Sequence, residues 1–211
     1  MGKINKGILG GFTGKVGTVV GAFWKGIAYM RSLAGSIHNP KTIKQTKQRA
    51  KFALLSQFLS HILGFINVGF KSQAIGMTEA NAAFIRNFDD VIGGDYPNYE
   101  LLYDKMIVST GNLELPDSPD ADIDGNILTV SWTDNSGTGK ALANDEAMLL
   151  AYNSVKEQAV YNIAAGKRSE RAASLTLPSA WSGDSVDCWF AMRNPDTNKC
   201  TKSIYLGNFS I

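Results

Sequence analysis

The first part of the chain alternates glycine with β-branched and aromatic residues. Seven glycines between Gly7 and Gly26 are interleaved with valine, phenylalanine and tryptophan. This pattern predicts two strands, at about 15–23 and 27–33, with a turn near Lys25-Gly26. Because glycine weakens a strand unless something packs closely against it, we expect the ribbon to lie against another surface, in this chain or a neighbouring one.

Two helices are predicted after the ribbon. Asn39 and Pro40 suit a helix cap and first turn, and apolar residues recur after them at three- and four-residue steps. The second helix is predicted to begin at Thr78 and to end at Gly93-Gly94. The apolar stretch Phe52–Phe70 raises the question of a membrane span, but its Ser, Gln, His and Asn residues favour a buried helix.

The second half of the chain has the pattern of an antiparallel β domain. One strand is expected at Lys105–Ser109, and short alternating strands follow Pro116 and Pro119. Strands of this length and spacing favour a β-sandwich of immunoglobulin or fibronectin type, without the Cys-Trp-Cys spacing of a true immunoglobulin domain. The expected strands are Asn126–Thr133, Ala147–Asn153, Ala159–Ile163, Ala172–Leu177, Ser185–Met192 and Cys200–Leu206.

These elements together predict an α+β protein in three parts. Residues 1–95 would form a basic β-ribbon with helices, and residues 96–116 would supply connecting strands. Residues 117–211 would form an acidic antiparallel β-sandwich. With 44% hydrophobic and 19% charged residues, the chain is able to bury a core.

The net charge of +2 hides a segregation of charge along the chain. The first 78 residues carry eleven of the 21 Lys and Arg and none of the 19 Asp and Glu, so the two parts carry about +11 and −9. Such asymmetry indicates a polyanionic partner or head-to-tail association, and a solvated lysine-rich face is the alternative. The residues expected to make contacts are Lys15, Trp24, Lys25, Arg31, Lys41, Lys44, Lys47, Arg49 and Lys51.

Aromatic residues beside these cations leave two interpretations open. Phe12, Phe23, Trp24 and Tyr29 are interleaved with Lys and Arg, as in proteins that bind single-stranded nucleic acid. In the other interpretation they form the apolar core of the ribbon. The pattern favours the core, because strands need apolar partners.

No residue set in the sequence is typical of catalysis. The glycine-rich start is not a phosphate-binding loop, because Leu9 and Val16 occupy positions that require glycine and Ser or Thr. The two histidines, His38 and His61, have no cysteine at zinc-ligand spacing, and no Gly-x-Ser-x-Gly elbow is present. We therefore expect a non-enzymatic protein with no cofactor and no small-molecule substrate.

Three aspartates form a metal-like motif. Asp120, Asp122 and Asp124, followed by Gly125, match the first positions of a calcium loop. The twelfth position is Ser131 instead of glutamate, and no helices are predicted to flank the segment. The pattern favours an acidic turn that opens the first sandwich strand, so no metal is expected and the three aspartates remain the calcium candidate.

We expect a cytoplasmic protein, or one assembled into a particle, with no signal peptide and no membrane partner. Lys15 and the repeated glycines interrupt any apolar leader. The expected strand register would hold Cys188 and Cys200 roughly 13 Å apart, too far for a disulfide, and free thiols suit a reducing compartment.

Several motifs resemble those of a known family. The start Gly11-Phe12-Thr13-Gly14-Lys15-Val16-Gly17 and the strand Leu128-Thr129-Val130-Ser131-Trp132-Thr133-Asp134 are similar to a family of uncharacterised Bacteroidota proteins, a domain of unknown function. The resemblance covers nearly the whole chain and implies a bacterial or phage origin without catalytic residues. The spacing of Asn39-Pro40, Thr42, Gln45, Arg49 and Phe52 is similar to that in small proteins of phage and prophage gene clusters.

These observations predict a structural component of an assembled particle, such as a phage or prophage virion, in which residues 1–50 make the contacts. Its expected partners are other copies of the chain or other structural proteins. The alternative is a nucleic-acid-binding protein that uses the ribbon and the Lys- and Arg-rich helix start.

Overall fold

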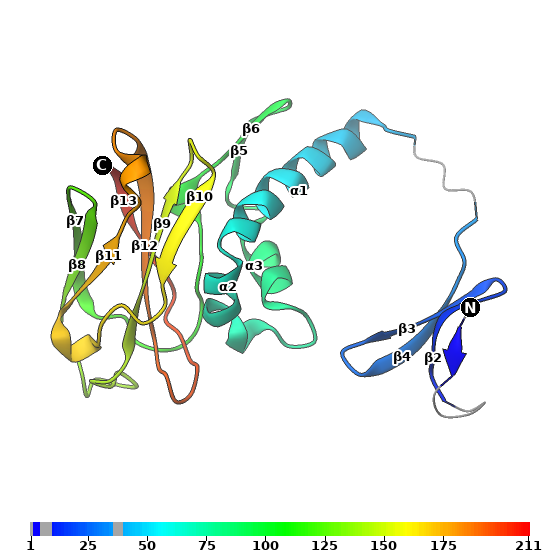
Figure 1. Ribbon diagram of the computed structural model, residues 1–211, viewed down its shortest axis with the longest axis horizontal. Coiled ribbons are helices and arrows are strands. Elements are labelled where there is room, and N and C mark those ends of the chain that lie inside the picture. The colour runs from blue at the N-terminus through cyan, green and yellow to red at the C-terminus, as the bar shows by residue number, and fades with distance from the viewer. Residues whose placement is uncertain (1, 5–9, 36–39) are drawn as a thin grey trace. The chain divides into compact units, whose positions relative to one another are not determined.

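The structure is a computed structural model that describes residues 2–4, 10–35 and 40–211, and the chain folds into two compact units, 1–43 and 44–211. The fold is α+β, mostly antiparallel strands in several sheets with some helix (Figure 1). The predicted class is confirmed, but the division at residue 95 differs from the one observed. The boundary lies earlier because the helices share a hydrophobic core with the β-sheets.

The N-terminal unit is a four-stranded antiparallel sheet in the order β1-β2-β3-β4. The predicted turn at Lys25-Gly26 is present, and both residues have positive φ, 45° and 83°, as a tight type I′ hairpin requires. The predicted strand over 15–23 is wrong, because a turn at Gly17, with φ 59°, divides it. The strands are β1 (Lys3–Ile4), β2 (Phe12–Val16), β3 (Val19–Trp24) and β4 (Ile27–Ser32).

The larger unit begins with helices α1 (Ile43–His61), α2 (Leu63–Gly69) and α3 (Glu79–Asn87). Helix α1 starts later than predicted, because Lys41 has a positive φ of 47° that a right-handed helix does not allow. The predicted cap Asn39 lies outside the described residues.

The predicted start of the second helix is confirmed. Thr78 is the N-cap of α3, and its hydroxyl accepts a 3.2 Å hydrogen bond from the Asn81 N–H. The predicted end at Gly93-Gly94 is wrong, because both glycines lie in β5 (Ile92–Asp95), which forms a hairpin with β6 (Asn98–Leu101).

The rest of the unit contains two larger antiparallel sheets, with strand orders β11-β8-β7 and β10-β9-β12-β13. Six of these strands overlap predicted ones, whereas β7 was not expected, because its aspartates are poor strand formers. The expected strand Lys105–Ser109 is wrong, since a short 3-10 helix and irregular chain occupy it. The strands are β7 (Asp117–Asp124), β8 (Ile127–Thr133), β9 (Glu146–Asn153), β10 (Gln158–Asn162), β11 (Ala172–Thr176), β12 (Ser185–Arg193) and β13 (Ile204–Ser210). The 3-10 helices are η1 (Lys71–Gln73), η2 (Tyr103–Lys105), η3 (Arg168–Glu170) and η4 (Ser179–Trp181).

Strands β9 and β12 are buried on both faces. Leu149 and Phe190 point into a core shared with β8 and β11, whereas Leu150 and Trp189 point into a second core shared with the helices. Figure 1 shows the resulting order of layers, with β7, β8 and β11 on one side of this sheet and the helices on the other. The unit is therefore a three-layer body with two hydrophobic cores.

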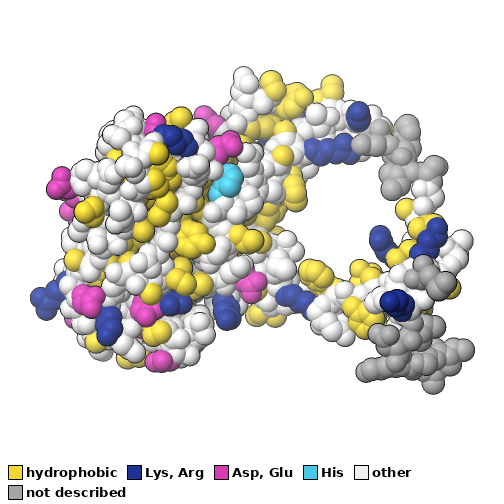
Figure 2. All heavy atoms as spheres, in the orientation of Figure 1, with side chains coloured by type: hydrophobic (Ala, Val, Ile, Leu, Met, Phe, Trp, Pro, Cys, Tyr) yellow, Lys and Arg dark blue, Asp and Glu magenta, His cyan; other side chains and the backbone are white. Residues whose placement is uncertain are grey.

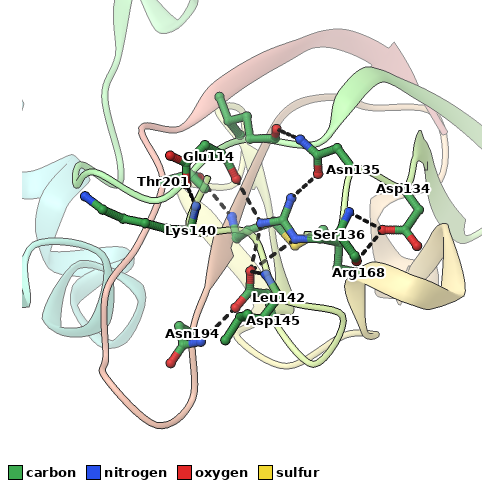
Figure 3. A network of polar contacts seen from close by, with 12 residues as sticks. Glu114, Asp134, Asn135, Ser136, Lys140, Leu142, Asp145, Arg168, Asn194 and Thr201 are labelled. Atoms are coloured by element: carbon green, nitrogen blue, oxygen red, sulfur yellow. Dashed lines mark hydrogen bonds and ion pairs between the residues drawn. The ribbon is translucent and has the colours of Figure 1, made fainter. Parts of the chain in front are cut away.

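A buried polar network ties the loops of the β-sheets together (Figure 3). The side chains of Arg168 and Asp145 are fully buried, and Arg168 Nη2 lies 3.0 Å from Asp145 Oδ2. The guanidinium also donates to Asn135 Oδ1 at 2.7 Å and to the Glu114 carbonyl at 2.8 Å. Asp145 Oδ1 accepts from Asn194 Nδ2 at 2.9 Å. Since each charged group has several partners, we assign the network a structural role.

Candidate interaction surface

The strand register gives the N-terminal sheet two chemically different faces. Side chains that are paired across an antiparallel ladder lie on the same face, and successive residues alternate between faces. Lys15 pairs with Val20, and Val20 pairs with Arg31, so the two cations share one face. Ala22 pairs with Tyr29, and Trp24 with Ile27, on that same face. We call it the basic aromatic face, made of Lys3, Lys15, Trp24, Tyr29 and Arg31.

The opposite surface is the apolar face, made of Phe12, Val16, Val19, Phe23 and Met30. Two glycines on this side allow aromatic rings to approach the backbone closely. A Cβ on Gly21 would lie 2.6 Å from the Phe12 ring, and one on Gly11 would lie 2.6 Å from the Phe23 ring. The surface that the glycine pattern led us to expect is therefore formed in part by the ribbon's own phenylalanines.

The aromatic residues do not all form a ribbon core, which is the interpretation that the sequence favoured. Phe12 is partly covered, but the exposed fractions of Trp24 and Tyr29 are 49% and 45%. Trp24 and Tyr29 lie on the face opposite Phe12, and Phe23, on the same face as Phe12, is itself 50% exposed, so neither face of the sheet fully buries its aromatic rings. Figure 2 shows dark-blue and yellow side chains side by side on this unit.

Of the cations predicted at the helix start, Lys41 belongs to the N-terminal unit, whereas Lys44, Lys47, Arg49 and Lys51 belong to the larger unit. On α1, the Lys51 ammonium lies 5.0 Å from the centre of the Tyr99 ring, and the Lys47 ammonium lies 6.0 Å from that of Tyr96. These two lysines therefore make cation–π contacts with the β5-β6 hairpin. Of the other predicted contact residues, Lys25 lies in the ribbon turn, Lys41 precedes α1, and Lys44 and Arg49 are exposed on α1.

The three calcium candidates lie on an extended strand instead of a loop. Asp120, Asp122 and Asp124 alternate along β7, pair with Ser131, Thr129 and Ile127, and are all exposed. Successive carboxylates on one face of a strand are about 6.6 Å apart along it, which does not form the closed loop that calcium requires. Within residues 2–4, 10–35 and 40–211, no group of three or more His, Cys, Asp or Glu residues is placed to hold a metal ion.

The hollows on the larger unit include two that differ in chemical character. An apolar groove of about 440 Å³ runs between α1 and α3 and is lined by Phe52, Leu63, Phe84 and Ile85, among others. A polar hollow of about 520 Å³ is lined by Arg86, Asp90, Asp104, Lys105, Lys202 and Tyr205, among others.

Several ionisable side chains of the larger unit are buried or partly buried, and their contacts are those of groups that pack within the fold. Burial raises the pKa of the Cys188 thiol to about 12 and that of the Cys200 thiol to about 11, so neither is a reactive nucleophile. Burial also raises the pKa of Asp187, which accepts a 2.6 Å hydrogen bond from the Tyr205 hydroxyl. His61 stacks on Tyr152 with 6.2 Å between ring centres.

No single helix in the described residues is long and apolar enough to cross a membrane. Helices α1 and α2 together meet the length and hydropathy criteria, but the chain bends by 85° between them. Both helices contribute buried residues, including Phe58 and Phe65, to the core that they share with β9 and β12.

The fold and the surfaces define a two-unit α+β protein whose N-terminal sheet is exposed on both faces. The chain belongs to the family of unknown function DUF6266, whose model matches residues 11–207. No curated protein matches the sequence.

Proposed function

We propose that the protein is a non-enzymatic structural or assembly protein that uses its N-terminal unit to bind other copies of itself. One observation carries this proposal. Strand β4 is the edge of its sheet, and all six of its residues, Ile27–Ser32, are exposed. The strand is largely apolar, and the exposed fraction of Met30 is 71%. An exposed apolar edge strand is a template for pairing with a strand of another chain.

The charge distribution favours a second copy of the chain as the occupant. The first 78 residues contain no Asp or Glu. The larger unit presents Asp117, Asp120, Asp122 and Asp124 along β7, and all four are exposed. Strand β4, whose one charged residue is Arg31, would therefore carry the basic unit of one copy to the acidic edge strand β7 of another copy. Such a contact is head-to-tail, which builds rings or filaments.

The strand orders support a more detailed assignment of the β-sheets. Counting from β7, the first, second and fifth strands form one sheet, and the third, fourth, sixth and seventh form the other. We infer a sandwich of the fibronectin type, with helices added on one side. On the resemblance noted for Asn39–Phe52, we also propose that the assembly is a phage or prophage particle of bacterial hosts in the Bacteroidota.

Sedimentation velocity over a concentration and salt series tests self-association. We expect the wild-type chain to associate, and added salt to weaken the association, because screening reduces the attraction between the basic N-terminal unit and the acidic strand β7. Met30→Lys should weaken it about tenfold or more, since a lysine on an edge strand opposes pairing.

Val155→Lys is the matched control, because the exposed fraction of Val155 is 72% and it lies in the larger unit. A wild-type chain that stays monomeric at every concentration and salt would overturn the proposal. Equal effects of the two lysine substitutions would also overturn it.

A further inference from the structure

The basic aromatic face has a regular arrangement of charge and ring surface. Lys15, Val20 and Arg31 form one cross-strand row, with the two cations at its ends. At about 4.8 Å between neighbouring strands, the two cations are roughly 10 Å apart across the sheet. Tyr29 lies in the next row of this face, two residues from Arg31 along β4, and Trp24 lies in the row after it, four residues from Val20 along β3.

Both kinds of side chain are available to a ligand. Lys15 and Arg31 are exposed, and the sequence of the N-terminal unit contains no Asp or Glu with which they could pair. Trp24 and Tyr29 are each about half exposed, at 49% and 45%. Large aromatic rings at the surface of a sheet, next to exposed cations, favour a ligand with both negative charge and flat apolar faces.

We propose that the basic aromatic face binds single-stranded nucleic acid. Lys3, Lys15 and Arg31 contact phosphates, and Trp24 and Tyr29 stack on bases. Positive charge that follows the backbone, combined with stacking on aromatic side chains, is the general means by which proteins bind single strands without sequence preference. A duplex fits less well, because its bases are stacked on each other and do not reach the two rings.

This inference does not depend on self-association through β4, because strand pairing would use the backbone edge of β4, whereas the proposed ligand lies on the face of the sheet. An acidic protein segment would also be attracted to the cations, but it would not need the rings. The contributions of Trp24 and of the cations therefore distinguish the two ligands.

Fluorescence anisotropy with a labelled oligothymidylate of about 20 nucleotides tests the proposal, since this exceeds the roughly 4–16 nucleotides that one small β-barrel covers. We expect the full-length chain to bind at low salt and to bind a duplex of equal length more weakly. Trp24→Ser should weaken binding roughly 5- to 150-fold, as the loss of one stacked base predicts. Trp24→Phe should retain most of the affinity, because phenylalanine also stacks.

The salt dependence of the affinity tests the charged residues separately. Lys15→Gln and Arg31→Gln should each reduce the slope of log affinity against log salt by about 0.7, one counterion contact on a single strand. Lys71→Gln is the matched control in the larger unit, and it should change neither the affinity nor the slope. Amide NMR spectra of each variant establish that the sheet is still folded.

Absence of binding by the wild-type chain at low salt overturns the proposal. Equal binding of duplex and single strand, together with no effect of Trp24→Ser, also overturns it and identifies a general polyanion surface. Binding of a poly-glutamate peptide as tightly as the oligonucleotide, with no effect of Trp24→Ser, overturns it in favour of an acidic protein partner.

Discussion

Arg168 and Asp145 form a fully buried ion pair, with 3.0 Å between Nη2 and Oδ2, in loops that are 23 residues apart in sequence. The pair lies where η3 meets the loop before β9, and the Arg168 N–H also donates to the Asp145 carbonyl at 2.7 Å. It therefore fixes two connections of the β-sheets at once.

Replacing one member of this pair should be strongly destabilising. Arg168→Met leaves the Asp145 carboxylate buried without its counter-charge, and we expect the free energy of unfolding to fall by about 3–5 kcal/mol. Arg193→Met is the control, because the Arg193–Glu146 pair is partly exposed and its loss should cost no more than about 1 kcal/mol. Urea unfolding measures both, and a similar small loss in the two variants would contradict the role assigned to Arg168.

Asp187 should make the stability of the larger unit fall as pH rises. Burial raises its folded pKa above the ordinary value, so the folded state binds the proton more tightly than the unfolded state does. Its contribution to stability is present below the ordinary pKa and is lost as pH rises towards the raised one. Asp187→Asn should therefore gain stability relative to wild type over this range, with its Oδ1 still able to accept from Tyr205.

Asp184 provides a control of opposite sign for that measurement. Hydrogen bonds from Lys156 and Asn153 lower its pKa, so its contribution is present above the ordinary pKa and is lost as pH falls through the lowered one. Asp184→Asn should lose stability at neutral pH and little at low pH. Urea unfolding at a series of pH values gives both differences, and the same sign for the two variants would contradict the explanation.

Gly21→Ala should disrupt the N-terminal sheet without unfolding the larger unit. A Cβ at this position would lie 2.3 Å from the Phe12 carbonyl oxygen and 2.6 Å from its ring, and the backbone is unable to move away without breaking the ladder between β2 and β3. Hydrogen exchange should speed up over residues 12–32 and remain unchanged beyond residue 44, since these segments belong to different compact units. Gly35→Ala is the control, because nothing lies within 4 Å of its Cβ position.

Thr78→Ala should remove the cap of α3 at a cost of about 1 kcal/mol. Thr78 Oγ1 accepts from the Asn81 N–H. This N–H lies in the first turn, where backbone N–H groups have no carbonyl partner within the helix. Thr78→Ser keeps the hydroxyl and should retain most of the stability. Thermal unfolding of the three proteins separates the cap from the packing of the threonine methyl group, and equal losses in both variants would rule out the cap as the cause.

The sequence by itself determined the features that depend on near neighbours along the chain. The turn at Lys25-Gly26, the cap at Thr78 and most strands of the β-sheets follow from local backbone preference and from alternation of apolar and polar residues. Segregation of charge is likewise a property of the sequence alone. The register of β3 with β4 also follows from the sequence, because a two-residue turn fixes it, and this register separates the two faces of the hairpin. The pairing of β2 with β3 was not predicted, because the turn at Gly17 was not recognised.

Only the tertiary structure decided which surfaces the buried segments meet. Strands β9 and β12 are apolar on both faces, and nothing in their pattern says that helices cover one side. The same packing places α1 in one compact unit with the β-sheets. It also brings the Lys51 ammonium over the Tyr99 ring. The physical reason is that hydrophobic burial has no direction, so a local pattern shows that a face is buried but not what buries it.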